Sequence, residues 1–276
     1  MLTIHSTMSL NNGVEIPRLG LGVYQSDPGD ETRRAVLHAL DAGYRHIDTA
    51  AAYRNEESVG AALAESGVPR ADVFITTKLW NQDHGYEAAL AALDRSLDRL
   101  GLDTVDLYII HWPVEGHRLD SWRALEHALE LGKARSIGVS NYLVRHLDEV
   151  LDEGTVVPAV NQIELSPYIF ETRRDTVELC RSRGIALEAY SPLTKARKLD
   201  DPPLVAIAEK HGRTTAQILI RWALRKDFIV IPKSVHADRI RENANVFDFE
   251  LDDEDMAALD ALDEGLATGW DPADAP

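Results

Sequence analysis

EAALAALDRSLDRLGLDTVDLYIIH, residues 87–111, is the stretch of sequence that decides the fold class. Leucines recur through its first part at the spacing of one helical face, and Gly101 ends that segment. The apolar run 105–111 then has the length and composition of a buried strand. The stretch therefore predicts an amphipathic helix followed by a strand of a parallel sheet. The leucine stripe consists of Leu90, Leu93, Leu97 and Leu100.

The same unit recurs along the chain, since short apolar runs alternate with amphipathic segments that end at a glycine. A left-handed helix C-cap favours glycine, so we expect that conformation at each of these positions. The glycines are Gly43, Gly67, Gly101, Gly132, Gly154 and Gly184. The predicted strands are Leu19–Val23, Tyr44–Thr49, Val73–Lys78, Val105–His111, Arg135–Ser140, Ala159–Ile163, Ile185–Tyr190 and Phe228–Pro232.

Eight strand and helix units favour an α/β fold of the closed (β/α)8 type, the TIM barrel. We predict a single domain over residues 1–276, with an N-terminal β-hairpin around Asn11–Gly13 and a short C-terminal tail. The acidic residues 252–255 are expected to begin a last helix, where they suit the helix dipole. An open doubly wound sheet is the alternative. Its dinucleotide fingerprint is missing, because residues 20–22 are followed by no third glycine at the required offset.

Charge and composition exclude several classes of function. The net charge of −17 repels nucleic acid and anionic lipid, and no apolar run is long enough to cross a membrane. With Cys180 as the only cysteine and no secretory signal, we expect a cytoplasmic protein. No metal motif is present, and neither Ser140 nor Ser191 lies in a Gly-x-Ser-x-Gly elbow. We therefore expect no metal, no nucleic acid and no membrane partner.

Polar residues end seven consecutive predicted strands. In a (β/α)8 barrel, substrates bind at the C-terminal ends of the strands, so these side chains should line one site. They are Asp48 and Thr49, Lys78, His111, Ser140 and Asn141, Asn161 and Gln162, Tyr190 and Ser191, and Lys233.

Four of the polar residues near the strand ends have the chemistry of a proton-transfer set. Tyr53 follows Asp48 closely in the sequence, and its phenol is a weak acid. A nearby Lys78 ammonium would favour the phenolate, and Asp48 would hold Lys78 charged. His111 could donate a hydrogen bond to a carbonyl oxygen as negative charge develops there.

The chain resembles the aldo-keto reductase family from near its N-terminus to about residue 265. Within the family it is similar to the prokaryotic branch that includes 2,5-diketo-D-gluconate and methylglyoxal reductases. The resemblance rests on residues 43–50 (GYRHIDTA) with Tyr53, on 77–80 (TKLW), 111–113 (HWP), 138–141 (GVSN), 161–162 (NQ), 189–193 (AYSPL) and 231–234 (IPKS), and on Arg239, Glu242 and Asn243.

The resemblance implies reduction of small carbonyl compounds with hydride from NADPH. It implies that Tyr53 is the general acid, that Lys78 and Asp48 tune it, and that His111 orients the carbonyl. It also implies a cofactor site. The nicotinamide carboxamide would be held by Ser140, Asn141 and Gln162, and its ring would stack on Tyr190. The site would also be lined by Ser191 and Leu193. The 2′-phosphate would be bound by Lys233, Ser234 and Arg239, and the adenine would lie near Glu242 and Asn243.

The loop after residue 193 is basic within an acidic chain. Lys195, Arg197 and Lys198 lie where the family has a loop that crosses the pyrophosphate, so these cations are candidates to clamp it. Thr194 stands where many relatives have a small residue, so the sequence does not predict the conformation of this loop.

Aromatic residues are expected to form the walls of the substrate pocket and to suit small aldehydes, ketones and dicarbonyls. They are Tyr24, Trp80, Trp112 and Trp270, the last in the C-terminal tail. The resemblance also implies a monomer. Two other functions fit the sequence: an isomerase or aldolase that uses Lys78 as a Schiff-base amine, and a regulatory subunit that binds NADPH without turnover.

Overall fold

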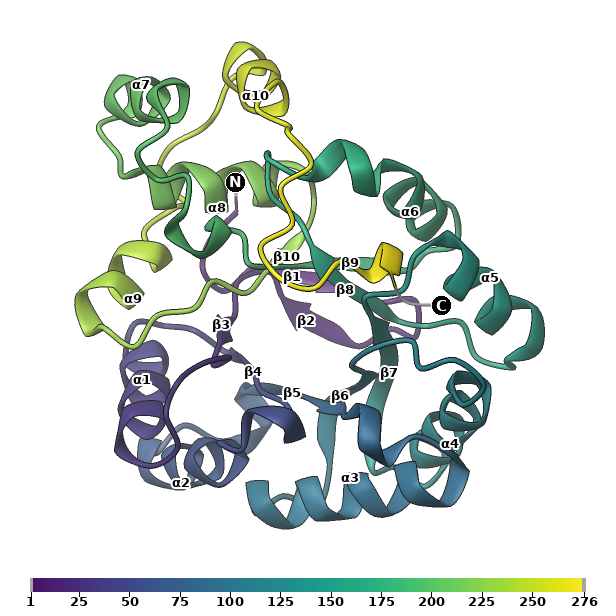
Figure 1. The fold of residues 1–276 in the computed structure, drawn as a ribbon. Helices are drawn as coiled ribbons and strands as arrows, with labels where there is room; N and C mark the ends of the chain where they lie inside the picture. Colours follow the sequence, from purple (N-terminus) through teal and green to yellow (C-terminus); the bar gives the residue numbers. More distant parts are fainter. Residues whose placement is uncertain (1, 275–276) are drawn as a thin grey trace.

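The computed structural model describes residues 2–274, in which eight parallel strands form a ring. Each strand pairs with the next one in the sequence, in the order β3 to β10. Figure 1 looks into this ring and shows the helices outside it. The predicted (β/α)8 barrel is therefore confirmed. Its strands are β3 (Leu21–Gly22), β4 (His46–Asp48), β5 (Phe74–Leu79), β6 (Val105–Ile110), β7 (Ala134–Ser140), β8 (Val160–Glu164), β9 (Ala186–Tyr190) and β10 (Ile229–Val230).

The helices cover the outside of the strands (Figure 1). Their apolar side chains are buried in the core. The leucine stripe of α3 follows the predicted pattern, since Leu93, Leu97 and Leu100 are buried. Asp252 caps the last helix by accepting a hydrogen bond from the backbone of Asp255, as the acidic stretch predicts. The helices are α1 (Asp30–Asp41), α2 (Glu56–Ser66), α3 (Tyr86–Leu100), α4 (Arg118–Glu130), α5 (Val144–Glu153), α6 (Phe170–Ser182), α7 (Pro202–His211), α8 (Thr215–Arg225), α9 (Ala237–Ala244) and α10 (Asp253–Asp260).

The barrel closes where its first and last strands meet, and both are shorter than predicted. Val230 donates a backbone hydrogen bond to Arg18 and accepts one from Gly20, each at 2.9 Å. A Cβ atom at Gly22 would lie 3.0 Å from the carbonyl oxygen of Ile231, so glycine permits this close approach. The regular ladder is interrupted at Pro232, which has no N–H to donate, and the two segments pair again through an isolated bridge between Gly22 and Lys233.

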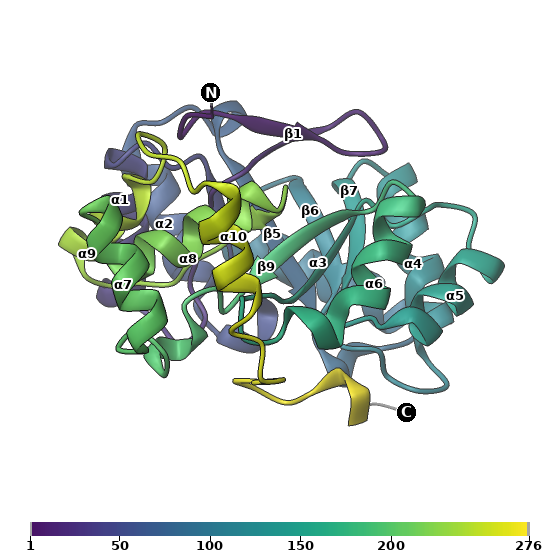
Figure 2. The ribbon, with the colours of Figure 1, turned by 90° about the horizontal axis from the view of Figure 1, so that it is seen from above.

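The N-terminal hairpin and the C-terminal tail lie at opposite ends of the barrel, as Figure 2 shows. Strands β1 (Thr7–Ser9) and β2 (Glu15–Pro17) pair antiparallel and form the predicted hairpin. The tail follows α10 and crosses the other end, where the strands have their C-termini (Figure 1). No helix within residues 2–274 is both long and apolar enough to span a bilayer.

One of the predicted helix-ending glycines does not have the expected conformation. Gly154 ends α5 with an extended backbone, at φ −81°, whereas Gly67, Gly101 and Gly184 have positive φ values. A Cβ atom at Gly154 would lie 2.6 Å from Nε1 of Trp122 and 2.6 Å from the carbonyl oxygen of Val150. Glycine is required at this position by close packing and not by a left-handed turn.

Candidate active site

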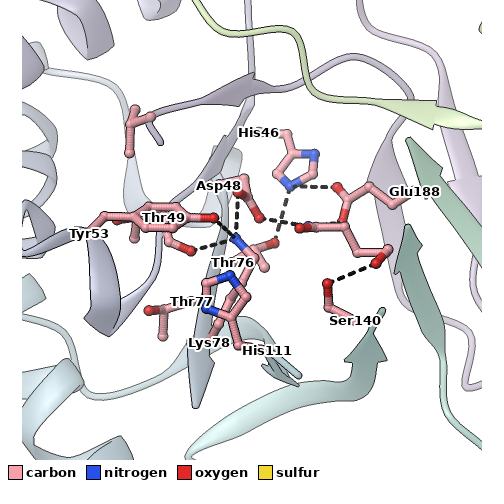
Figure 3. Close-up of polar contacts among 12 residues, drawn as sticks. His46, Asp48, Thr49, Tyr53, Thr76, Thr77, Lys78, His111, Ser140 and Glu188 are labelled. Atoms are coloured by element: carbon pink, nitrogen blue, oxygen red, sulfur yellow. Dashed lines mark hydrogen bonds and ion pairs between the residues drawn. The ribbon is translucent and has the colours of Figure 1, made fainter. Parts of the chain in front are cut away.

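The four predicted proton-transfer residues lie together at the C-terminal end of the barrel (Figure 3). Asp48 ends β4, Lys78 lies near the end of β5, and His111 follows β6 directly. Tyr53 comes from the short 3-10 helix Ala51–Tyr53, which follows β4. The centre of its ring is 5.5 Å from that of His111. Neighbouring parallel strands thus bring the four residues to one place.

Lys78 is the centre of the group, and its side chain is fully buried. Its Nζ atom donates to Oδ1 of Asp48 at 2.6 Å, to the carbonyl oxygen of Thr49 at 2.8 Å and to the Tyr53 hydroxyl at 3.3 Å. An ammonium group has three protons, so this geometry uses all of them. Burial raises the pKa of Asp48, while the Lys78 charge and the hydrogen bonds from Lys78 and Gln162 oppose that rise.

Tyr53 departs from one expectation, because its pKa is raised well above its usual value and not lowered by Lys78. Burial is the main cause, and the negative charge of Asp48 is the next. Asp48 neutralises the ammonium at shorter range than the 3.3 Å contact between Lys78 and Tyr53. The consequence is that the phenol remains protonated at neutral pH. It holds a proton that it can donate.

His111 is neutral in this environment. Its side chain is buried, and both burial and the nearby Lys78 charge hold the pKa of its imidazole well below the usual value. Nδ1 is buried without a hydrogen-bond partner. An unpaired buried N–H is rarer than an unpaired acceptor, so we assign the ring proton to Nε2. A neutral imidazole with Nε2–H can donate a hydrogen bond to a carbonyl oxygen.

The residues expected around a nicotinamide are linked to one another and to the catalytic group. Gln162 donates to Oδ2 of Asp48 at 2.9 Å, and Ser140 donates to the backbone carbonyl of Gln162 at 2.8 Å. Asn141 has a left-handed backbone, at φ 63°, and donates to the backbone carbonyl of His111. The Tyr190 hydroxyl donates to Asn141 Oδ1 at 2.8 Å. These side chains form one connected polar network.

Asn161 does not join that network, although the sequence placed it with Gln162 at the rim. Its side-chain amide donates to the carbonyl oxygen of Tyr142 at 2.9 Å and contacts the sulfur of Cys180 on α6. Successive residues of a strand point to opposite faces, so only Gln162 of this pair points to the barrel interior.

The residues expected at the 2′-phosphate lie in the segment that follows β10 and on α9, the next helix. Lys233 and Arg239 are exposed, and Nζ of Lys233 donates to the carbonyl oxygen of Gln25 at 3.0 Å. Ser234 Oγ accepts a hydrogen bond from the backbone of His236. Two exposed cations and a hydroxyl are a donor set that fits a phosphate dianion.

The two residues expected near the adenine are less exposed than these cations. Asn243 is buried on α9, and Glu242 accepts a hydrogen bond from the Thr214 hydroxyl at 2.8 Å.

The loop after β9 takes an unusual conformation and contacts the C-terminal tail. Ser191 has φ 47°, Leu193 packs against the core, and residues 194–196 all have positive φ values although none is a glycine. Lys195 donates to the carbonyl oxygen of Thr268 at 3.0 Å, and Lys198 pairs with Glu264 at 2.6 Å. Two of the cations suggested as pyrophosphate clamps therefore bind the tail in this structure.

Two of the four predicted pocket aromatics contact Tyr53 and His111, and the other two pack on each other. Ring centres lie 5.0 Å apart for Tyr24 and Tyr53 and 5.2 Å apart for Trp80 and His111. Trp270 of the tail packs on Trp112 with 4.4 Å between ring centres, and half of its surface is exposed. The tail thus adds an aromatic side chain next to Trp112.

Trp270 is held in place on both sides. Before it, the backbone N–H of Thr268 donates to the buried carboxylate of Glu164 at 3.0 Å, and the Thr268 hydroxyl binds the same carboxylate. After it, Asp271 pairs with Arg173 at 2.8 Å.

Sequence reasoning missed a buried polar layer deeper in the barrel. His46, Thr76 and Glu188 have no exposed surface, and Figure 3 shows them next to Asp48. Each lies two residues before a predicted site residue, namely Asp48, Lys78 and Tyr190. Because strand side chains alternate, a polar residue at this offset points to the same side as the site. The strand period could have identified all three.

Comparisons with known proteins agree on one family. The sequence model of the Aldo/keto reductase family matches residues 18–264. A glyoxal reductase of Bacillus subtilis is 48% identical over 270 residues, which are 98% of this chain and 97% of the relative. An aldo-keto reductase of Mycolicibacterium smegmatis is 51% identical over 267 residues, 96% of each chain. The crystal structure of a Bombyx mori aldo-keto reductase in complex with NADP is 38% identical, with a TM-score of 0.92, and covers 100% of this chain and 99% of that one.

Proposed function

Because the chain belongs to the aldo/keto reductase family and is therefore an oxidoreductase, we propose that it reduces small aldehydes, ketones and dicarbonyls to alcohols, with Tyr53 as the general acid. One observation carries the proposal. The Tyr53 hydroxyl lies 3.3 Å from the buried Lys78 ammonium and beside the neutral His111 ring, at the end of the barrel where substrates bind.

The cofactor of the family is NADP(H), and NADPH supplies the hydride when it is bound. Lys233, Ser234 and Arg239 would hold its 2′-phosphate, and Glu242 and Asn243 would lie near its adenine. At the reactive end, the carboxamide would be bound by Ser140, Asn141 and Gln162. The nicotinamide ring would stack on Tyr190, and the site would be lined by Ser191 and Leu193. The donor set after β10 fits this assignment, because it concentrates positive charge in an acidic chain.

The chain's own residues handle the proton. Tyr53 carries it at neutral pH and gives it to the carbonyl oxygen through its hydroxyl group. The Lys78 ammonium, held by Asp48, stabilises the phenolate that remains. His111 donates a hydrogen bond from Nε2 to the same oxygen as negative charge develops there. Placing these three groups around one atom lowers the barrier by orientation as well as by charge.

The aromatic surroundings of Tyr53 favour small carbonyl compounds as substrates. Tyr24, Trp80, Trp112 and Trp270 offer flat apolar surfaces around a few polar groups, as small-molecule sites commonly do. A similar chain, from Bacillus subtilis, is named glyoxal reductase, which is consistent with small dicarbonyls. We further propose that the protein acts in the cytoplasm as a single-domain monomer without nucleic-acid partners. Light scattering coupled to gel filtration tests the monomer.

A Schiff-base aldolase or isomerase is the less favoured function of this site. Its lysine must attack a carbonyl as a free amine, whereas Lys78 is fully buried and donates three hydrogen bonds, one of them to a carboxylate. Borohydride trapping of a carbonyl substrate on Lys78 would support the aldolase or isomerase and contradict the reductase.

The deciding experiment is an NADPH-oxidation assay over aldoses, keto acids, dicarbonyls and aromatic aldehydes, with wild type, Tyr53→Phe and Tyr86→Phe. Tyr86 is a matched control, since its hydroxyl bonds His127 on the outer surface. We expect Tyr53→Phe to lose turnover by about 10²–10⁴-fold, the usual contribution of a general acid, and to bind NADPH like wild type. Tyr86→Phe should keep wild-type rates.

Two results of this assay would contradict the proposal. Full turnover in Tyr53→Phe would remove Tyr53 from the reaction. NADPH binding by the wild type without reduction of any carbonyl would favour a regulatory subunit.

A further inference from the structure

Glu188 is a fully buried carboxyl group to which the mechanism above gives no role. It lies in the middle of β9, one strand away from Gln162 on β8, and the two residues are direct partners in the sheet register. Burying a charged carboxylate is costly, and an apolar side chain would fill this position at no such cost. The contacts of Glu188 explain why a carboxyl group occupies this position.

One oxygen of Glu188 holds Gln162. Glu188 Oε2 accepts from Nε2 of Gln162 at 2.7 Å, and the same nitrogen donates to Oδ2 of Asp48 at 2.9 Å. An amide nitrogen carries two protons, so both are used. Gln162 is thereby clamped between two carboxyl groups, and its own oxygen is left as the atom that can accept a hydrogen bond from a ligand.

The other oxygen of Glu188 locates the proton of the carboxyl group. Oε1 lies 3.5 Å from Nε2 of His46 and makes no hydrogen bond of ordinary length. Burial, followed by the charge of Asp48, raises the pKa of Glu188 to about 8, and burial lowers the pKa of His46 to about 3. Both groups are thus neutral at pH 7. Because Oε2 accepts from Gln162, Oε1 is the oxygen that carries the proton whenever the carboxyl group is protonated.

The charges around Glu188 explain why the neutral form suits the site. His46 and Asp48 approach it from β4 and Lys78 from β5, while Gln162 on β8 and Ile229 on β10 are not titratable. One ammonium therefore faces one ionised carboxylate, Asp48. Ionised Glu188 would add a second negative charge near Lys78 and raise the pKa of Tyr53 further.

We propose that Glu188 is a positioning residue of the reductase site: its carboxyl oxygen accepts from the Gln162 amide and thereby fixes the orientation of that amide and, through it, of Asp48. Glu188 acts through Gln162 and does not touch the substrate. The inference rests on the proposed function for its effect on turnover. Its effect on Gln162 is independent of turnover and can be measured by binding.

The test compares Glu188→Leu, which removes the acceptor, with Glu188→Gln, which keeps an acceptor oxygen and stays neutral at every pH. Glu126→Gln is the matched control, because Glu126 is also buried but binds the backbone of Thr155 and Val156 on the outer side of the barrel. Two ligands are titrated by tryptophan fluorescence, namely NADP+ and adenosine 2′,5′-bisphosphate, which lacks the nicotinamide.

We expect Glu188→Leu to weaken NADP+ binding about tenfold and to leave adenosine 2′,5′-bisphosphate binding unchanged. Its kcat should fall about 10–100-fold, as misplaced catalytic groups cause. Glu188→Gln and Glu126→Gln should bind and turn over like wild type at about pH 7. The kcat of wild type should decline above about pH 8, and that of Glu188→Gln should not.

The inference is overturned if Glu188→Leu keeps both its NADP+ affinity and its kcat, or if Glu188→Gln shows the same alkaline decline as wild type. Equal weakening of both ligands in Glu188→Leu would indicate general damage to the fold and would also count against a positioning role. A wild type that reduces no carbonyl, combined with selective loss of NADP+ binding in Glu188→Leu, refutes the proposed reaction and supports the positioning of Gln162.

Discussion

Lys78 shows how one buried charge organises several polar groups. All three of its protons are donated, to Asp48, to the backbone of Thr49 and to Tyr53. A buried ion pair contributes little net stability by itself, but removing one partner leaves the other charge buried and uncompensated. The pair therefore has separable effects on folding and on chemistry.

Replacing Lys78 by methionine should destabilise the fold by about 3–5 kcal/mol, because the Asp48 carboxylate would remain buried without its cation. The double variant Lys78→Met with Asp48→Asn should recover most of that loss, since both charges are gone. Neither variant should reduce a carbonyl. Urea denaturation measures the stabilities, and equal stability of the single and double variants would refute this prediction.

The sequence could predict the rim residues better than the interior ones. The sequence could predict the positions of Asp48, Lys78 and His111, because each ends a recognisable apolar run and the strand ends meet at one side of a barrel. The role of Glu188 depends on contacts with Gln162 from the neighbouring strand and with His46 from across the barrel. Strand pairing and barrel curvature decide such contacts, and a single sequence states neither of them.

At the scale of elements, Gly154 illustrates a close helix contact. Its missing side chain leaves room for the fully buried indole of Trp122 on α4. Gly184 differs, because it has φ 69° and open space where a Cβ atom would be. The pattern of a helix ending at glycine is the same in both cases, so the sequence could not separate a packing glycine from a left-handed one.

Gly154→Ala should cost about 1–3 kcal/mol through overpacking against Trp122. Part of this loss should disappear in a Trp122→Phe background, because phenylalanine has no atom at the position of Nε1. Gly184→Ala should cost about 1–2 kcal/mol from backbone strain in either background. Thermal or urea unfolding of wild type and the two glycine variants, each with and without Trp122→Phe, gives the coupling energies. A Gly154→Ala cost that is the same in both backgrounds would disprove the contact as the cause.

The tail is an element whose role depends on how it is held. Bonds from Thr268 to Glu164 and from Asp271 to Arg173 flank Trp270 and place its ring on Trp112. Trp270→Ala should therefore raise KM for an aromatic aldehyde about three- to tenfold, the size of one lost aromatic contact. The kcat and the affinity for NADPH should change little. Steady-state kinetics checks this, and an unchanged KM would mean that Trp270 does not contact substrate.

The boundaries of β3 and β10 could not be read from sequence for a related reason. Both runs are apolar over more residues than the structure assigns to strands. The two segments meet only in isolated bridges, Leu19 with Val230 and Gly22 with Lys233, and Pro232 between them has no N–H to donate. Such an ending depends on which distant segment is the partner.

For the molecule as a whole, the buried His46 and the half-buried His84 make folding sensitive to acid. Burial lowers the pKa of His46 to about 3 and that of His84 to about 4. The unfolded chain binds protons at these histidines from about pH 6.5 downward, and the folded chain does not until lower pH. Their stabilising contribution is therefore fully present above about pH 6.5 and is lost as the pH falls.

His46 alone should reduce the free energy of unfolding by about 1.4 kcal/mol per pH unit between about pH 6 and 4. His84→Asn should make the decline of stability over this range shallower than in wild type, because one protonation of the unfolded chain is removed. The asparagine amide has both a donor and an acceptor, so it can keep the hydrogen bond between the His84 ring and the Ser121 hydroxyl. Urea midpoints at several pH values measure the slope, and identical slopes would contradict the assignment.

The join between β3 and β10 gives the barrel a seam. A few backbone hydrogen bonds near Gly20, Gly22 and Val230 hold it, and two of the residues there contribute no side chain to pack across it. The ladders between β5, β6 and β7 are longer and pair four or more residues of each strand. When the native ring opens transiently, the hydrogen bonds of this seam should break first. The amide protons of Gly20 and Val230 should therefore exchange with deuterium before those of β6.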